Sequence, residues 1–150
     1  MNADRYATLY SQFTWHVPRE VNWFEMCCAR WARRTPRAVV IVAESEQGVV
    51  VHHDYADLHD AALRCAGALA ALGVARGDRV AIVMPQRFET AVAQMAVSAL
   101  GAVAMPLSML FGPEALQYRL SDSEAKAAIV DESAIDALLT AAAACPALEH

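Results

Sequence analysis

Apolar residues recur at helical spacing over two long stretches of the chain. After Asp54 they lie three and four positions apart and form one stripe that ends at Gly73. Asp54 and Asp57 have the spacing of a capping box, and glycine accepts the left-handed conformation that commonly ends a helix. The pattern predicts a helix between these two ends. Residues 86–100 show the same periodicity before Gly101 and predict a second helix.

Short, wholly apolar runs alternate with helical patterns in the second half of the chain. The pattern predicts strands at residues 79–85, 102–107 and 127–131. Pro113 starts a helix predicted to reach residue 122, and Ser133 is predicted to cap a last helix that runs to residue 144. Apolar strands joined by amphipathic helices are typical of β-α-β crossovers, so we expect a parallel sheet covered on both faces.

The first third of the chain carries two weaker patterns. Asn22, with Glu25 three positions later, predicts the start of a short helix that ends before Pro36. Two apolar runs, residues 38–43 and 48–52, are separated by polar residues and predict a β-hairpin. The expected fold class is therefore α/β, a parallel β-α-β layer preceded by a helix and a β-hairpin.

Composition excludes several classes of protein. The chain has 150 residues, of which 57% are hydrophobic and 19% charged, which excludes a disordered chain or a coiled coil. A net charge of −5 argues against a nucleic-acid surface. Residues 90–113 lack charge over a length that could span a bilayer, but Gly, Pro, Ser and Gln interrupt them, so we interpret them as a helix, a turn and a buried strand. We expect a cytoplasmic protein with no membrane or nucleic-acid partner.

Common catalytic and metal-binding motifs do not occur in this sequence. It has no G-x-G-x-x-G, no G-K-[ST] and no G-x-S-x-G, and its four cysteines lack zinc-finger spacing. His52 and His53 would point to opposite faces of a strand, so we expect no metal site there. Asp131 and Glu132 lie at a strand end, where we interpret them as a cap or a solvated surface. Lys126 is the only lysine.

Ligands of open parallel sheets bind beyond the carboxyl ends of the strands. Residues 108–112 follow one of these ends and form the longest and least polar of the three connections. This loop is suited to line the binding site of an elongated, partly apolar ligand. Gly112 would permit the ligand to approach the backbone closely. The alternative is that Met109, Leu110 and Phe111 pack into a larger core.

Four segments together resemble a known family. They are Tyr55-Ala-Asp-Leu58 and residues 73–85, 99–107 and 108–120. In this order they are similar to the N-terminal portion of the AMP-forming acyl-CoA synthetases, members of the adenylate-forming superfamily. Residues 108–120 resemble the CoA-ligase branch. The pattern from Phe13 to Trp31 is similar to the medium-chain and aryl acyl-CoA synthetases.

The resemblance implies a two-step reaction of fatty acid metabolism. A carboxylic acid attacks ATP, with Mg²⁺ bound, to give an acyl-adenylate, and the thiolate of CoA then displaces AMP. The family's phosphate loop, hinge and C-terminal lysine have no counterpart in residues 1–150. We therefore interpret the chain as a partial N-terminal AMP-binding domain, inactive alone and binding no cofactor tightly. The alternative is a stand-alone, non-enzymatic α/β binding module.

The resemblance also assigns one set of site residues. Leu110, Phe111 and Gly112 correspond to the segment that lines the pantetheine tunnel of CoA ligases. Asp136 and Leu139 stand about where acetyl-CoA synthetases place two arginines for the CoA phosphates, which makes an acetyl-specific enzyme less expected.

The partial domain is expected to expose apolar surface and therefore to self-associate or to be partly molten. The residues concerned are Trp15, Trp23, Trp31 and the segment 109–111.

Overall fold

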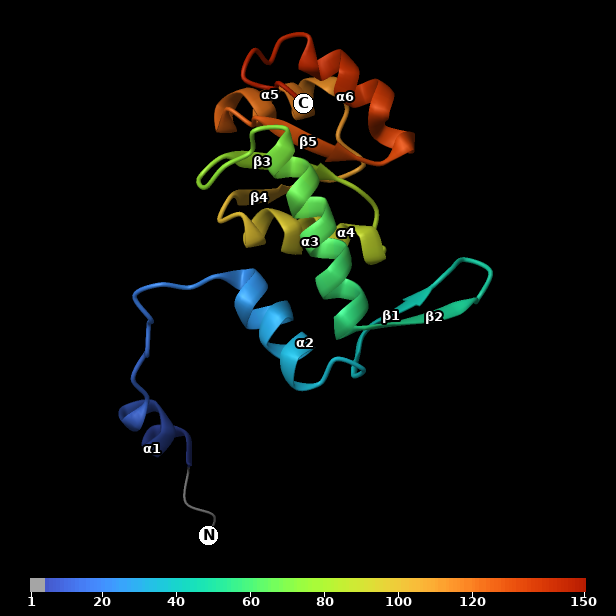
Figure 1. Cartoon of the computed structure of the whole chain (residues 1–150). Helices are drawn as coiled ribbons and strands as arrows, with labels where there is room; N and C mark the ends of the chain where they lie inside the picture. Colours follow the sequence, from blue (N-terminus) through green and yellow to red (C-terminus); the bar gives the residue numbers. More distant parts are fainter. Residues whose placement is uncertain (1–4) are drawn as a thin grey trace.

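The computed structural model describes residues 5–150, and its centre is a three-stranded parallel sheet with the strand order β4-β3-β5. The strands are β3 (Arg79–Val83), β4 (Val103–Pro106) and β5 (Ala127–Val130). The helices around it are α3 (Tyr55–Ala71), α4 (Phe88–Ala99), α5 (Pro113–Ser123) and α6 (Ile135–Ala142) (Figure 1). The predicted parallel β-α-β layer is confirmed.

The central strand β3 is buried on both faces. Val80 and Ile82 pack with the buried residues of α3 and α4, whereas Ala81 and Val83 pack with those of α5 and α6. Helices on both faces bury Val80 to Val83, and Arg79 at the start of the strand is partly exposed. This explains why the strand reads as a continuous apolar run without polar alternation.

The predicted ends of α3 and α4 are confirmed. Asp57 donates its N–H to Asp54 Oδ1 at 2.9 Å, and the Asp57 carboxylate accepts from the Asp54 N–H, which completes the capping box. Gly73 and Gly101 follow the two helices with φ of 85° and 68°. These left-handed values suit glycine, because a Cβ would be strained there.

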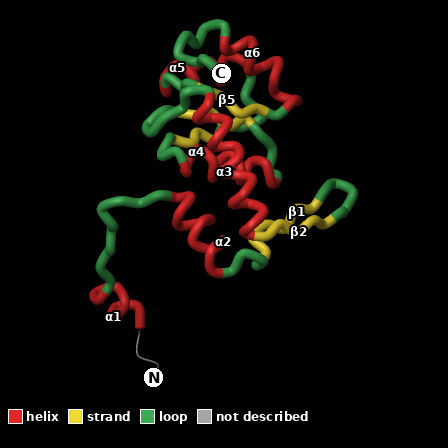
Figure 2. Tube along the Cα trace, in the orientation of Figure 1, coloured by secondary structure: helices red, strands yellow, loops and turns green. Residues whose placement is uncertain are grey.

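The N-terminal region consists of small, separate elements (Figure 2). They are α1 (Arg5–Gln12), the π-helical turn η1 (Glu25–Ala29), α2 (Arg30–Arg34) and the antiparallel hairpin of β1 (Val39–Glu44) and β2 (Val50–Asp54). The hairpin is confirmed. Asn22 accepts the Glu25 N–H at 3.1 Å, as expected, and the helix that follows contains a π turn before it continues as α2. The helix α1 was not predicted from the sequence.

Two expectations about single residues were wrong. Ser133 does not cap α6. Instead Asp131 caps the short 3₁₀ turn η2 (Glu132–Ala134), and Ser133 donates both its N–H and its hydroxyl to that carboxylate. Trp31 is half-buried, because its ring stacks on Tyr55 with centroids 6.2 Å apart. Trp15 and Trp23 are exposed, as expected.

The uncharged stretch 90–113 folds into most of α4, a turn and β4, as predicted. The expectation that the strand is buried was wrong, because β4 lies at the edge of the sheet and Val103 is exposed. Within residues 5–150, no helix is both long enough and apolar enough to cross a bilayer.

Candidate functional site at the carboxyl edge of the sheet

The carboxyl ends of β3, β4 and β5 meet at one edge of the sheet, because the three strands are parallel. Hydrogen bonding continues past the strands, since the Leu107 N–H donates to Ile82 O at 2.9 Å and the Asp131 N–H donates to Val83 O at 2.9 Å. The connections that leave the strands therefore start side by side. This is the edge where ligands of open α/β sheets bind.

An ion pair joins two of these connections. Arg87 Nη2 lies 2.9 Å from Asp131 Oδ2, and only 8% of the Asp131 side chain is exposed. Arg87 occupies the N-cap position of α4, so the pair ties the start of this helix to the end of β5. Sequence analysis identified the Asp131 strand end but missed Arg87. The available signal was an arginine just after one buried strand and an aspartate just after its neighbour.

Asp131 is held in its ionised form. Hydrogen bonds from the Ser133 hydroxyl and N–H lower the pKa of the Asp131 carboxyl, and the positive charge of Arg87 lowers it further. A carboxylate in this state accepts hydrogen bonds and cannot donate a proton near neutral pH. The interpretation of Asp131 as a cap is confirmed.

The loop after β4 is a tight turn that separates its apolar side chains. Ser108 organises it, because its Oγ accepts the Leu110 N–H at 3.1 Å and its carbonyl accepts the Phe111 N–H at 3.2 Å. Met109 and Phe111 turn inward and pack against the core beside α5 and α6. Leu110 is 93% exposed. The core-packing alternative therefore holds for Met109 and Phe111 and is wrong for Leu110.

Gly112 is the N-cap residue of α5, and its surroundings do not require a glycine. Its φ of −72° and ψ of 172° are open to any residue. Within residues 5–150, no atom outside its chain neighbours lies within 4 Å of the position that a Cβ would occupy. Neither backbone strain nor crowding in this part of the protein explains the residue.

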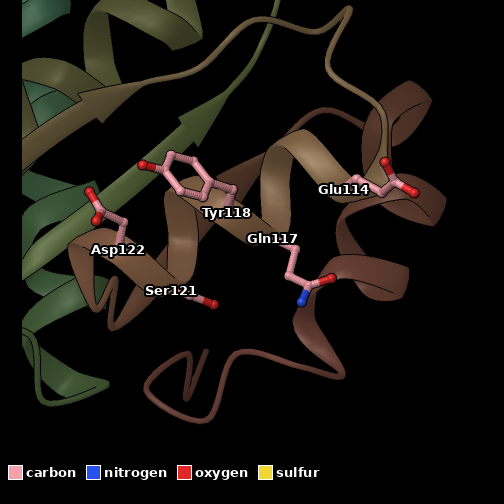
Figure 3. Close-up of a pocket in the computed structure, with 5 residues that line it drawn as sticks. All are labelled: Glu114, Gln117, Tyr118, Ser121 and Asp122. Carbon is pink, nitrogen blue, oxygen red and sulfur yellow. The ribbon is translucent and has the colours of Figure 1, made fainter.

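Three surface hollows lie around this architecture. One, of about 570 Å³, follows α5 and is lined by Glu114, Gln117, Tyr118, Ser121 and Asp122 (Figure 3). A second, of about 590 Å³, lies between the hairpin and the start of α4, and a third, of about 890 Å³, lies against residues 18–26. The predicted tunnel residues Leu110, Phe111 and Gly112 line none of the three.

Two histidines stack on phenylalanine rings, and one cysteine is fully buried. In the part of the chain that the structure describes, no three His, Cys, Asp or Glu side chains come together as metal ligands. His53 stacks on Phe88 with ring centroids 3.9 Å apart, and His59 stacks on Phe24 at 5.5 Å. Burial raises the pKa of the Cys28 thiol to about 11, so this cysteine stays protonated and is a poor nucleophile.

Residues 28–150 match the profile of a protein family described as AMP-binding enzyme. The chain belongs to this family. It is 36% identical to an acetyl-coenzyme A synthetase of Saccharophagus degradans over 123 residues, which are 81% of this chain and 19% of that protein. The predicted resemblance to the AMP-forming acyl-CoA synthetases is confirmed.

Solved structures of two further proteins share the fold. An acyl-CoA synthetase of Brucella canis superposes with a TM-score of 0.83 at 24% identity, covering 97% of this chain and 28% of that chain. A fatty acyl CoA synthetase of Mycobacterium tuberculosis has a TM-score of 0.72 at 33% identity, covering 85% and 25%. The chain thus spans about a fifth of its curated relative and about a quarter of these structures.

Proposed function

We propose that this chain works as the N-terminal part of an AMP-forming acyl-CoA synthetase. The parent enzyme activates a carboxylic acid with ATP to an acyl-adenylate, and CoA then takes the acyl group. The family match over residues 28–150 carries the proposal. The parallel sheet supports it, because the loop at its carboxyl edge exposes Leu110, beside which an extended thiol could pass.

The residues of this chain do not fit the ATP and Mg²⁺ that the family uses. The only lysine, Lys126, lies at the opposite edge of the sheet, where its Nζ donates to Gly73 O at 2.8 Å and pairs with Asp78 at 3.3 Å. No Ser/Thr/Gly-rich phosphate loop occurs in the sequence. We therefore assign the binding of ATP, Mg²⁺ and the acid to other parts of the parent protein.

The 150-residue chain alone is expected to form no acyl-adenylate. Pyrophosphate release measured with ATP, Mg²⁺ and a panel of fatty and aromatic acids tests this expectation. Acid-dependent release by the isolated chain would show that it carries the whole adenylation site.

Leu110, Phe111 and Gly112 are proposed to line the passage for the pantetheine arm of CoA. The supporting observations are the exposure of Leu110 and the absence of a local reason for glycine at position 112. In the complete enzyme, Gly112→Leu narrows the passage and should slow thioester formation about tenfold or more, with pyrophosphate exchange within about two-fold of wild type. Gly67→Leu is the matched control, because Gly67 also has open space around it but lies on α3. Parallel loss of both half-reactions with a lower melting temperature would refute the assignment.

A medium-chain or aryl acid is the proposed substrate. Asp136 and Leu139 are exposed on α6, and neither offers the positive charge that acetyl-CoA synthetases use for the CoA phosphates. The named relatives include acetyl-CoA synthetases. The substrate class is therefore decided by measuring kcat/KM of the complete enzyme for acetate, octanoate and benzoate. Preference for acetate would overturn this part of the proposal.

The rival function is a stand-alone binding module without catalysis. Tight nucleotide binding by the 150-residue chain, together with no adenylation motif in the reading frame after residue 150, would favour it. A cytoplasmic location also belongs to the proposal, with the four free cysteines as its support.

A further inference from the structure

Arg119 covers the ring of Phe111, one of the proposed passage residues. Its Cζ lies 4.0 Å from the ring centroid, and its Nη1 donates to the Ala115 carbonyl at 2.8 Å. The second contact ties the guanidinium to the first turn of α5. Two contacts therefore fix one side chain at the end of the exposed loop.

The charge of Arg119 is not used in an ion pair with any residue from 5 to 150. Among residues 5–150, arginines 33, 37, 79 and 87 each pair with a carboxylate, and Arg119 does not. Its interactions are the ring and one backbone carbonyl. A planar guanidinium stacks well on an aromatic face, so Arg119 is suited to hold a ring in one orientation.

Phe111 needs such support because of where it lies. It belongs to a turn between β4 and α5, and its neighbour Leu110 is almost fully exposed. The ring packs against the core beside α5 and α6, and Arg119 covers a ring face. Without the guanidinium, that face loses its cover and the ring is free to tilt toward the space next to Gly112.

We propose that Arg119 is a positioning residue for the thiol-transfer step. It fixes the Phe111 ring and thereby the shape of the passage wall beside Gly112. The proposal rests on the proposed function, because it gives Arg119 a role in the passage assigned there to CoA. Arg119 itself is not expected to touch the reacting atoms.

The test uses the complete enzyme with Arg119→Met, Arg119→Lys and the control Arg64→Met, an exposed arginine of α3. In Arg119→Met the KM for CoA should rise about five-fold, the size expected from the loss of one cation–π contact, while kcat stays within about two-fold. Arg119→Lys should recover part of the effect, because an ammonium also stacks on a ring. Arg64→Met should equal wild type.

A double-mutant cycle shows whether Arg119 acts through Phe111. In a Phe111→Leu background, Arg119→Met should add almost nothing to the KM for CoA, because the ring that it holds is gone. An unchanged KM in Arg119→Met, or the same increase in both backgrounds, would overturn the inference. Equal losses of pyrophosphate exchange and thioester formation in both Arg119 variants would also overturn it and show a structural role.

Failure of the proposed function gives a different result. It appears as the absence of acid-dependent pyrophosphate exchange in the wild-type complete enzyme, and the inference falls with it. Normal exchange with an unaltered response to CoA in Arg119→Met refutes the inference alone.

Discussion

The sheet region and the N-terminal region differ in how far their apolar residues are buried. The sheet encloses β3 between two pairs of helices, and four of the five residues of this strand are buried. Residues 5–23 are exposed along their whole length, although they include Leu9, Phe13 and Trp15. The contrast shows that the central strand of the sheet is covered by helices of this chain, whereas the apolar side chains of residues 5–23 are not covered by the residues that the structure describes.

The strongest test of this contrast truncates one apolar side chain in each region and compares the two losses of stability. Ile82→Ala removes a side chain that is buried beside α3 and α4 and should lower the free energy of unfolding by about 2–5 kcal/mol. Val50→Ala, in the half-exposed hairpin, should cost less than about 0.5 kcal/mol. Urea unfolding followed by circular dichroism measures both. Equal costs would mean that the hairpin is as well packed as the sheet.

Self-association should depend on the N-terminal region. Replacing Trp15 and Trp23 together with serine removes two large exposed rings and should weaken association of the 150-residue chain roughly tenfold. Light scattering over a concentration series measures the effect, with Gln12→Ser as control. A wild-type chain that stays monomeric at every concentration would contradict the expectation, since cover would then be unnecessary.

A smaller effect is expected at the contact that joins the two regions. The Asn22 side chain donates to Ser98 O at 2.9 Å and accepts the Glu25 N–H, so it connects the start of η1 to the end of α4. Asn22→Ala should cost about 1 kcal/mol, as for other helix caps. Hydrogen exchange should become faster in α2 and unchanged in β3. Faster exchange in the sheet would show that the two regions unfold as one unit.

The smallest effect concerns acid. The pKa of Asp131 is lowered in the folded protein by Ser133 and Arg87, so its ionised form stabilises the fold above the unfolded pKa near 4. This contribution is lost as pH falls through the lower, folded pKa. The melting temperature should therefore fall less steeply from about pH 5 to 2 in Asp131→Asn than in wild type. Identical slopes would exclude Asp131 as a source of acid sensitivity.

Patterns within a segment predicted most of the fold. The capping box at Asp54, the apolar run of β3 and the hairpin all depend on neighbouring residues, and all three are confirmed. The helix α1 was not predicted, although Tyr6, Leu9 and Tyr10 lie at helical spacing. The stripe is short, and none of the residues of α1 is buried.

The candidate site was harder to predict, because its contacts join residues far apart in the sequence. The Arg87–Asp131 pair and the Arg119–Phe111 stack depend on which connections meet at one edge of the sheet. Sequence gives the order of the strands along the chain and leaves their order in the sheet open. The assignment of Leu110, Phe111 and Gly112 came from family resemblance and stays a prediction.

Lys126 makes this chain convenient for chemical labelling. It is the only side-chain amine, and it lies at the amino edge of the sheet, away from the proposed CoA passage. An amine-directed dye would therefore attach to one side chain without blocking that passage. Because Gly73 and Asp78 both hold the amine, its labelling rate should rise when this edge of the sheet opens, and so report local unfolding in real time.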